Sequence, residues 1–260
     1  MVLLHGFPEF WYSWRKQIPA LVEAGFHVIA PDMRGYNLSD KPSSVRAYRS
    51  ELLTRDVARL IDAFGAERAT VIGHDWGAAV AWSFAMAYPG RLERLGILNV
   101  PHPLVFFRAL RTARQLRKSW YVFFFQVPGL PEIMARARNY AFLRAAFRDS
   151  VLRGSFTIED VERYIQAIGQ PGALTAGINY YRALMRSGRG SLRRVRRIEQ
   201  PVLVIWGERD RYLGKELAEP PVAWVPNARV ERLPAASHWV HNDEPERVNQ
   251  LLLDFLRASY

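Results

Sequence analysis

The chain has 260 residues, of which 49% are hydrophobic and 13% aromatic, and it contains no cysteine. This composition supports a large buried core and excludes a disordered chain. The absence of cysteine excludes disulfide bonds, thiolate metal sites and a cysteine nucleophile. The formal net charge of +11 first suggests a protein that binds nucleic acid.

The positive charge is concentrated in the middle of the chain. Residues 102–200 contain 18 Lys and Arg against 6 Asp and Glu, and the rest of the chain is close to neutral. The same segment has helical patterns and an aromatic run at 120–125, whereas its flanks hold the short β-branched runs typical of buried parallel strands. We therefore expect an α/β core formed by residues 1–101 and 200–260, with a helical insert at 102–199.

Short apolar runs alternate with amphipathic segments along the core, as in βα units. Short crossovers of this kind join parallel strands through right-handed connections. The expected order is a strand at 2–4, a helix at 14–24, a strand at 28–30, a helix at 50–64, a strand at 70–73, a helix at 78–88 and a strand at 95–100, followed after the insert by strands at 201–206 and 230–233 and a helix at 245–256.

The sequence Gly73-His74-Asp75-Trp76-Gly77 lies between an expected strand and an expected helix. It has the form of a nucleophile elbow, the G-x-S-x-G turn, with aspartate in the place of serine. No serine of the chain lies in such a sequence, which argues against a serine esterase. An aspartate nucleophile attacks an sp³ carbon and forms an alkyl ester that water must then hydrolyse. The alternative is that Asp75 only caps the following helix.

A carboxylate and a histidine follow later strands of the core. Asp210 comes just after the strand at 201–206, and His238 follows the strand at 230–233. The chain order of nucleophile, acid and histidine is the order found in α/β hydrolases. Glu208 is the alternative acid and His241 the alternative base, although His241 is expected to be a solvated residue near a helix start.

An oxyanion hole is indicated at the start of the chain. His5-Gly6-Phe7-Pro8 follows the first expected strand and fits the loop that donates one N–H, from Phe7. The second N–H would come from Trp76, the residue after Asp75. Taken alone, the HGFP sequence fits a simple β-turn equally well.

Four motifs together resemble the epoxide hydrolase family of α/β hydrolases. They are HGFPE at the start of the chain, GHDWGA around Asp75, GERD ending at Asp210, and SHW around His238. The resemblance covers essentially the whole chain. It implies an α/β-hydrolase fold with a mostly parallel sheet flanked by helices, in which the insert is a helical cap over the active site.

The resemblance also implies two cap tyrosines that hold the epoxide oxygen. Tyr121 resembles the first and Tyr181 the second. Adjacent helical residues point about 100° apart, so only one of Tyr180 and Tyr181 is expected to face the site. Without the resemblance, each tyrosine is better interpreted as a cap residue that buries its ring.

The tyrosines favour epoxide opening over dehalogenation. Opening an epoxide leaves an alkoxide that needs a proton donor, whereas a departing halide needs only N–H donors. Dehalogenases of this type commonly place an asparagine after the HG dipeptide, where this chain has Phe7. We therefore predict a hydrolase that converts epoxides to vicinal diols through an ester on Asp75, with a haloalkane or haloacid dehalogenase as the alternative. The alternative from another class is a catalytically impaired binding protein with a basic cap.

No cofactor is expected, because the chain has no H-E-x-x-H, P-loop or G-x-G-x-x-G sequence and no other metal-ligand spacing. The aromatic run at 120–125 suggests an apolar or aromatic epoxide, with water as the second substrate. The basic run at 193–197 is the best argument for a nucleic-acid partner, but such runs are usually solvated linkers, so none is expected.

The start of the chain predicts location and assembly. No basic segment or long apolar run precedes His5, and no run approaches the roughly 20 residues of a membrane span, so a soluble, cytoplasmic protein is expected. Compared with the family, the chain begins inside the third strand, which predicts that a hairpin of roughly 20 to 30 residues is missing. Its loss would expose an apolar edge at 26–30 and favour a homodimer.

Overall fold

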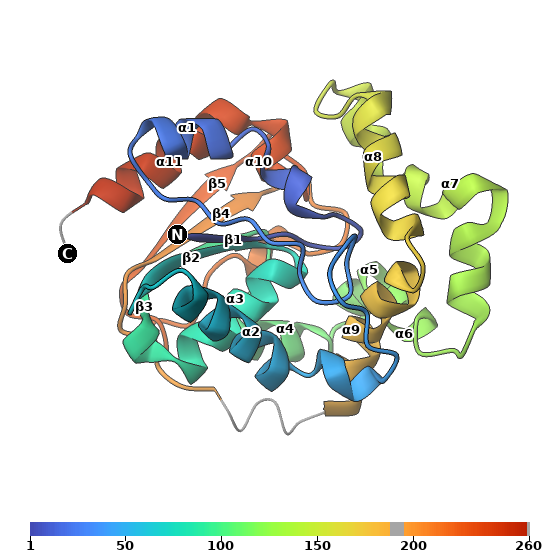
Figure 1. Cartoon of the computed structure of the whole chain (residues 1–260), viewed down its shortest axis with the longest axis horizontal. Coiled ribbons are helices and arrows are strands. Elements are labelled where there is room, and N and C mark those ends of the chain that lie inside the picture. The colour runs from blue at the N-terminus through green and yellow to red at the C-terminus, as the bar shows by residue number, and fades with distance from the viewer. Residues whose placement is uncertain (188–194, 259–260) are drawn as a thin grey trace.

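The computed structural model of the chain describes residues 1–187 and 195–258. Arg193 and Arg194, the first two residues of the basic run, lie outside the described residues. Within the described part, a parallel β-sheet occupies the centre of the molecule and helices surround it (Figure 1).

The sheet has five strands in the described residues, and every neighbouring pair is parallel. Leu4 pairs with Gly73, Gly73 with Ile97, and Ile97 with Val204, so the carboxyl ends of these strands meet at one edge of the sheet. Loops at this edge are where open α/β sheets bind their ligands. In spatial order, which is also chain order, the strands are β1 (Val2–Leu4), β2 (Ala69–His74), β3 (Leu92–Leu98), β4 (Val202–Gly207) and β5 (Ala228–Leu233).

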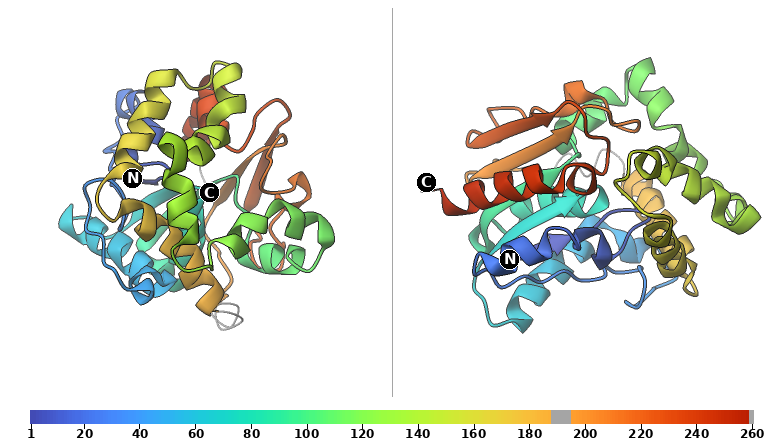
Figure 2. Two further views of the ribbon diagram at one scale, coloured as in Figure 1. Left: turned by 90° about the vertical axis from the view of Figure 1, so that its right-hand side faces the viewer. Right: turned by 90° about the horizontal axis from the view of Figure 1, so that it is seen from above.

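Helices cover both faces of the sheet, as Figures 1 and 2 show. Alternate strand residues point to opposite faces, so Val71 joins one apolar cluster and its neighbour Ile72 joins the other. This two-sided burial explains why the strands are almost continuously apolar. The first face is covered by α2 (Ser50–Ala63) and α3 (Trp76–Ala87), and the second by α1 (Ile18–Glu23), α10 (Val240–Asp243) and α11 (Pro245–Arg257).

The segment between β3 and β4 is helical. Beginning with α4, its helices continue into a layer beyond the carboxyl edge of the sheet, formed by α5 to α9 (Figures 1 and 2). Helix α7 is broken at 137–140, where Arg138, Asn139 and Tyr140 have positive φ angles. The bounds are α4 (Pro103–Ala109), α5 (Ala113–Lys118), α6 (Trp120–Phe124), α7 (Leu130–Leu152), α8 (Ile158–Gly169) and α9 (Ala173–Ser187).

The expected strand at 28–30 is wrong. Only Ile29 forms a bridge there, opposite Val2, with its N–H donating to Met1 O at 3.0 Å and its O accepting from Leu3 N at 2.8 Å. The segment therefore lies beside β1 at the edge of the sheet, but β1 is only three residues long and gives it too few partners for a strand.

The expected helix at 14–24 is also shorter than predicted. The structure has a 3-10 helix at Trp11–Trp14 and then α1, which begins at Ile18. Pro19 lies in the first turn of α1, where its missing N–H is tolerated; further inside a helix it would remove a hydrogen bond. Other boundaries differ as well: α3 begins at Trp76 rather than at 78, β3 runs over Leu92–Leu98 rather than 95–100, and β5 begins at Ala228 rather than at 230.

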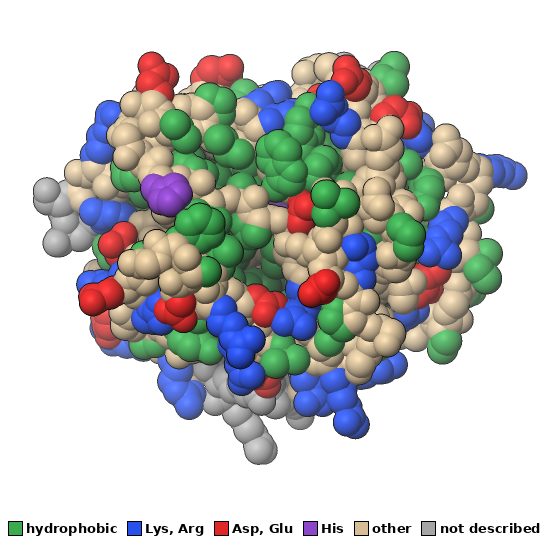
Figure 3. All heavy atoms as spheres, in the orientation of Figure 1, with side chains coloured by type: hydrophobic (Ala, Val, Ile, Leu, Met, Phe, Trp, Pro, Cys, Tyr) green, Lys and Arg blue, Asp and Glu red, His purple; other side chains and the backbone are tan. Residues whose placement is uncertain are grey.

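The surface carries mixed charge. On the face drawn in Figure 3, Lys and Arg side chains are interspersed with acidic and neutral ones. Pairs such as Arg34 with Asp56 and Arg232 with Glu219 are part of this pattern, which is typical of a solvated surface. None of the helices that the structure describes combines the length and apolar character needed to cross a membrane.

Candidate active site

Asp75 lies at a strained turn between β2 and α3. Its φ and ψ are 48° and −121°, a conformation that costs a non-glycine residue about 1–3 kcal/mol. The turn is tight because the chain passes close to its neighbours: a Cβ added to Gly77 would lie 2.1 Å from Leu4 O. One added to Gly73 would lie 2.4 Å from the Gly77 backbone. The glycine spacing thus permits a turn that presents the Asp75 carboxylate at the sheet edge.

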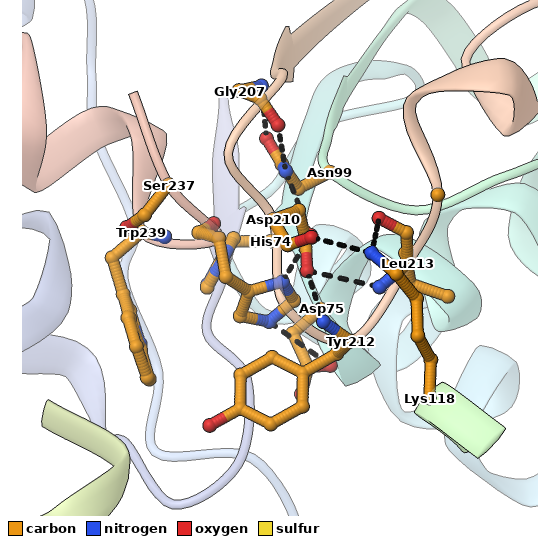
Figure 4. Close-up of polar contacts among 12 residues, drawn as sticks. His74, Asp75, Asn99, Lys118, Gly207, Asp210, Tyr212, Leu213, Ser237 and Trp239 are labelled. Carbon is orange, nitrogen blue, oxygen red and sulfur yellow. Dashed lines mark hydrogen bonds and ion pairs between the residues drawn. The ribbon is translucent and has the colours of Figure 1, made fainter. Parts of the chain in front are cut away.

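His238 lies between the carboxylates of Asp210 and Asp75. Both of these carboxylates are labelled in Figure 4, with their polar contacts as dashed lines. Its Nδ1 is 2.7 Å from Asp210 Oδ2, and its Nε2 is 3.5 Å from Asp75 Oδ2. The side chains of His238 and Asp210 are buried, and that of Asp75 is 17% exposed. Asp75, His238 and Asp210, three predicted site residues from separate loops, therefore form a row of polar contacts, which we call the triad.

The Asp210 carboxylate is held by donors on both of its oxygens. Oδ1 accepts from the N–H groups of Tyr212 and Leu213, at 2.7 and 2.9 Å, and Oδ2 accepts from Asn99 Nδ2 at 2.8 Å. Asn99 also accepts from Gly207 N at 2.8 Å, and it adopts a φ of 51°. Asn99 was not among the predicted site residues, because the strand was expected to extend to residue 100 but ends at Leu98. The available signal was the asparagine itself, a residue that tolerates this φ.

These contacts determine the charges of the group. Burial acts to raise the pKa of Asp75, but the hydrogen bond and charge of His238 outweigh it and hold that pKa below its ordinary value. Burial likewise opposes ionisation of Asp210, and His238 and Asn99 lower its pKa. For His238, burial acts to lower the pKa, yet Asp210 and Asp75 raise it to about 10. At neutral pH, Asp75 and Asp210 are therefore carboxylates and His238 between them is an imidazolium.

The loop after β1 places an N–H against the Asp75 carboxylate. Phe7 N donates to Asp75 Oδ1 at 2.8 Å. Gly6 precedes it, and a Cβ there would lie 2.4 Å from Asp75 Cβ, so only glycine fits. Trp76, the other predicted donor, is the first residue of α3, and its ring packs against Tyr181 with centroids 4.9 Å apart.

Tyr121 and Tyr181 come from α6 and α9, and both line cavities that contain Asp75. Their ring centroids are 5.8 Å apart. Burial, followed by the nearby charge of Asp75, raises the pKa of each phenol well above its ordinary value, so both keep their protons. Tyr180 also borders one cavity, but its hydroxyl donates to Arg34 O at 2.7 Å, so its proton is already engaged away from Asp75.

Two cavities meet at Asp75. One has a volume of about 480 Å³ and lies against α3, α4 and α9; the other, of about 230 Å³, lies against α6 and α7. Asp75, Tyr121 and Tyr181 line both. The smaller cavity is strongly aromatic, and its ring-bearing walls include Phe7, Trp120, Phe125, Phe142, Tyr212 and Trp239. The arrangement offers a carboxylate and two O–H donors to a largely apolar molecule.

The alternative acid and base lie elsewhere. Glu208 pairs with Arg232 at 3.4 Å and with Lys215 at 3.5 Å. His241 is fully buried, so the expectation of a solvated histidine is wrong. Its ring lies 4.9 Å from that of Trp14, because α10 packs on the segment that leads into α1. Burial first, and neighbouring cations second, lower its pKa well below 6.5.

Glu9, His74 and His241 form a buried group behind the triad. Their ligand atoms lie within 4.8 Å of one another, a spacing that could hold a metal ion. His74 Nδ1 is 2.8 Å from Glu9 Oε2, and its Nε2 lies 2.9 Å from His238 O. In this arrangement, the pair of Glu9 and His74 fixes the backbone of His238.

Known proteins resemble this chain over its whole length. A model of the alpha/beta hydrolase fold matches residues 1–245. The AB hydrolase superfamily protein YfhM of Bacillus subtilis is 47% identical, over 99% of this chain and 90% of its own. Epoxide hydrolase 2 of Caenorhabditis elegans is 40% identical, over 100% of this chain and 74% of its own. The solved structure of a Bacillus megaterium epoxide hydrolase in complex with an inhibitor is 35% identical, with a TM-score of 0.91 over 99% of this chain and 93% of that one.

Proposed function

The chain belongs to the epoxide hydrolase family of the α/β hydrolases and is an enzyme that hydrolyses epoxides, and we propose that it does so through a covalent ester on Asp75. Its substrates are a small epoxide and water. We propose an apolar or aromatic epoxide, because aromatic side chains surround the cavities that meet at Asp75. Residues 102–199 would act as the cap that carries the two tyrosines.

In the first step, Asp75 Oδ2 attacks an epoxide carbon. The carbon–oxygen bond of the ring breaks, and its electron pair stays on the epoxide oxygen. The hydroxyls of Tyr121 and Tyr181 donate hydrogen bonds to that oxygen, and one of them protonates it. The product is an alkyl ester on Asp75 that carries the first hydroxyl of the future diol.

Ester formation changes the acidity of His238. The ester carries no charge, so one of the two carboxylates that raise the pKa of His238 to about 10 is removed. The pKa of His238 then falls, and its imidazolium proton passes to the tyrosine phenolate that the first step left. This exchange leaves His238 neutral, as the next step requires.

In the second step, neutral His238, oriented by Asp210, takes a proton from water while the water oxygen attacks the ester carbon. Negative charge develops on Oδ1, to which Phe7 N already donates at 2.8 Å; we propose the Trp76 N–H as the second donor. The intermediate collapses as the bond between the Asp75 carbonyl carbon and Oδ2 breaks. Oδ2 leaves as the oxygen of the second hydroxyl of the diol and takes the remaining proton of the water, whose oxygen stays on Asp75. Asp75 is again a carboxylate and His238 an imidazolium.

One observation supports this proposal most strongly. His238 Nε2 lies 3.5 Å from Asp75 Oδ2 and its Nδ1 lies 2.7 Å from Asp210 Oδ2, while two protonated tyrosines line the cavities at Asp75. A serine-type hydrolysis has no use for two phenols, whereas an epoxide oxygen needs a proton.

The test traps the ester. His238→Ala incubated with styrene oxide is expected to gain the mass of one epoxide, and peptide mapping should locate it on Asp75. Adding Asp75→Ala to that variant should abolish the adduct. In water enriched in ¹⁸O, a single turnover of the unmodified enzyme should leave the label in Asp75 rather than in the diol. Label in the diol would show direct attack by water, and turnover of haloalkanes without epoxides would favour a dehalogenase.

A further inference from the structure

Exposed apolar side chains are concentrated in one segment of the helical layer. Fifteen large apolar side chains are exposed among the described residues, and eight of them belong to residues 116–142. A contiguous exposed apolar surface marks a place where a protein contacts something other than water. We call these eight the apolar patch: Leu116, Trp120, Phe123, Val127, Leu130, Ile133, Met134 and Phe142.

The members of the apolar patch follow one another closely on α5, α6 and α7. Trp120 and Phe123 are three residues apart in α6, and Leu130 and Ile133 are three residues apart in α7, so each pair shares one face of its helix. The ring of Phe142 lies 6.3 Å from that of Trp120, which joins the later part of α7 to α6. In Figure 1, α7 lies on the outer side of the helical layer, away from the sheet.

Positive charge accompanies the apolar patch. Residues 103–148 contain nine Lys and Arg but a single acidic residue, Glu132, which is buried in an ion pair. Arg117, Arg136 and Arg138 lie between members of the patch in the chain. All three are exposed, and none forms an ion pair with another described residue. This segment therefore presents apolar and cationic side chains together.

The apolar patch includes part of the wall of the aromatic cavity at Asp75. Trp120 and Phe142 line that cavity, and they are also 52% and 37% exposed. Both rings therefore lie between the cavity and the surface. An apolar molecule that reaches the patch can enter the cavity past them.

Charge distinguishes two possible occupants of the apolar patch. A symmetric dimer uses the same surface of both copies, so it would bring the arginines of one copy close to those of the other, and like charges repel. A membrane surface with anionic lipids has the opposite charge, and it accepts Trp, Phe and Leu side chains at the boundary between headgroups and acyl chains. The composition of the patch therefore favours a membrane surface.

We propose that the apolar patch binds the surface of a membrane that contains anionic lipid. The arginines contact the phosphate headgroups, and the apolar side chains enter the boundary with the acyl chains. Trp120 and Phe142 then face the lipid, and an apolar epoxide dissolved there reaches Asp75 without crossing bulk water. The binding surface is independent of the chemistry at Asp75, whereas this route of the substrate rests on the proposed function.

Co-sedimentation with vesicles tests the binding surface. The protein should bind vesicles of phosphatidylcholine and phosphatidylglycerol about tenfold more tightly than vesicles of phosphatidylcholine alone, and salt should weaken the binding. Ile133→Ser/Met134→Ser removes two apolar side chains and should weaken the binding about tenfold. The matched control is Leu38→Ser/Val222→Ser, which removes two exposed apolar side chains outside the patch and should bind like the unmodified protein. A dimer that forms without lipid and that Ile133→Ser/Met134→Ser dissociates would assign the patch to a second copy and overturn the proposal.

The arginines are tested in the same assay. Arg117→Gln/Arg136→Gln should weaken binding to the anionic vesicles about tenfold and leave binding to phosphatidylcholine unchanged. Arg55→Gln/Arg59→Gln on α2 removes the same charge from exposed positions of the core and should change neither. Equal effects of the two pairs, or no binding to anionic vesicles, would overturn the proposal.

An activity measurement separates the binding surface from the chemistry. With a long-chain 1,2-epoxyalkane dissolved in anionic vesicles, Ile133→Ser/Met134→Ser should lower kcat/KM about tenfold, whereas kcat/KM for styrene oxide in solution should not change. An equal loss on both substrates would overturn the route through the lipid. Vesicle binding without turnover of any epoxide would support the binding surface and overturn the proposed function. Turnover of styrene oxide without vesicle binding would overturn the binding surface and leave epoxide hydrolysis intact.

Discussion

The two halves of the proposed active site are stabilised in different ways. At the sheet edge, His238 lowers the pKa of Asp75 and Asp210, and main-chain N–H groups and one asparagine hold the two carboxylates in place. In the helical layer, Tyr121 and Tyr181 are held mainly by ring packing with Phe125, at centroid distances of 5.9 and 5.0 Å. Ionised groups need donors with fixed positions, whereas neutral phenols need a shaped apolar wall. The sheet therefore supplies charge and the helices supply neutral proton donors.

One buried ion pair ties the helical half together. Arg182, next to Tyr181, binds Glu132 at 2.7 Å and donates to the carbonyls of Phe125 and Val127. With a second contact to Glu132 at 3.1 Å, four hydrogen bonds from the Arg182 guanidinium join α9 to the end of α6 and the start of α7. The helical layer thus has one polar clamp within an aromatic environment.

The largest effect is expected in the sheet half. Asp75→Ala removes the proposed nucleophile and should lower kcat for epoxide opening by at least about 10⁴-fold, with an unchanged circular dichroism spectrum. Alanine keeps a Cβ at this positive φ, so the strain of the turn is retained in the variant. Residual activity above 1% would show that the ester is not on the reaction path.

The clamp should dominate the stability of the helical half. Arg182→Met leaves Glu132 buried without its partner and should lower the free energy of unfolding by about 3–5 kcal/mol in urea titrations. Arg182→Met/Glu132→Leu removes both charges and should regain most of that loss. A single variant as stable as the unmodified protein would show that the clamp does not hold the layer.

The tyrosines test the division of roles directly. Tyr181→Phe keeps the ring but removes one proton donor, and it should lower kcat for epoxides about 10²-fold with little change in stability. Tyr180→Phe is the matched control. It should keep kcat unchanged, and the loss of the hydrogen bond to Arg34 O should lower the free energy of unfolding by roughly 1 kcal/mol. The reverse pattern would assign the site to Tyr180.

The smallest effect concerns pH. Burial lowers the pKa of His5 and His241, and that of His102 to about 4, so below pH ~6.5 only the unfolded chain takes up these protons and stability falls. The raised pKa of His238 acts oppositely: its contribution is complete below pH ~6.5 and is lost as pH rises toward 10. Melting temperatures should therefore peak near pH 6.5. His241→Gln should flatten the acid side alone, and an unchanged acid side would contradict this assignment.

The sequence predicted the sheet half better than the rest. Asp75, Asp210 and His238 each follow a strand, and parallel strands end at one edge, so linear spacing implies spatial proximity. The contact of Asn99 with Asp210 and the burial of His241 were missed, because both depend on which loops pack together. The Arg182–Glu132 pair joins residues 50 positions apart, a separation that no local pattern encodes.

The contact between His74 and the His238 carbonyl has a mechanical consequence. His74 is covalently bonded to Asp75, and its imidazole lies 2.9 Å from His238 O, so one side chain connects the backbone beside Asp75 to the backbone of His238. Glu9 braces that imidazole from the loop that supplies the Phe7 N–H. The loops that carry Phe7, Asp75 and His238 are therefore connected through the His74 side chain, and we expect them to move together. On heating, we expect the helical layer to loosen while the 3.5 Å gap between Asp75 and His238 is retained.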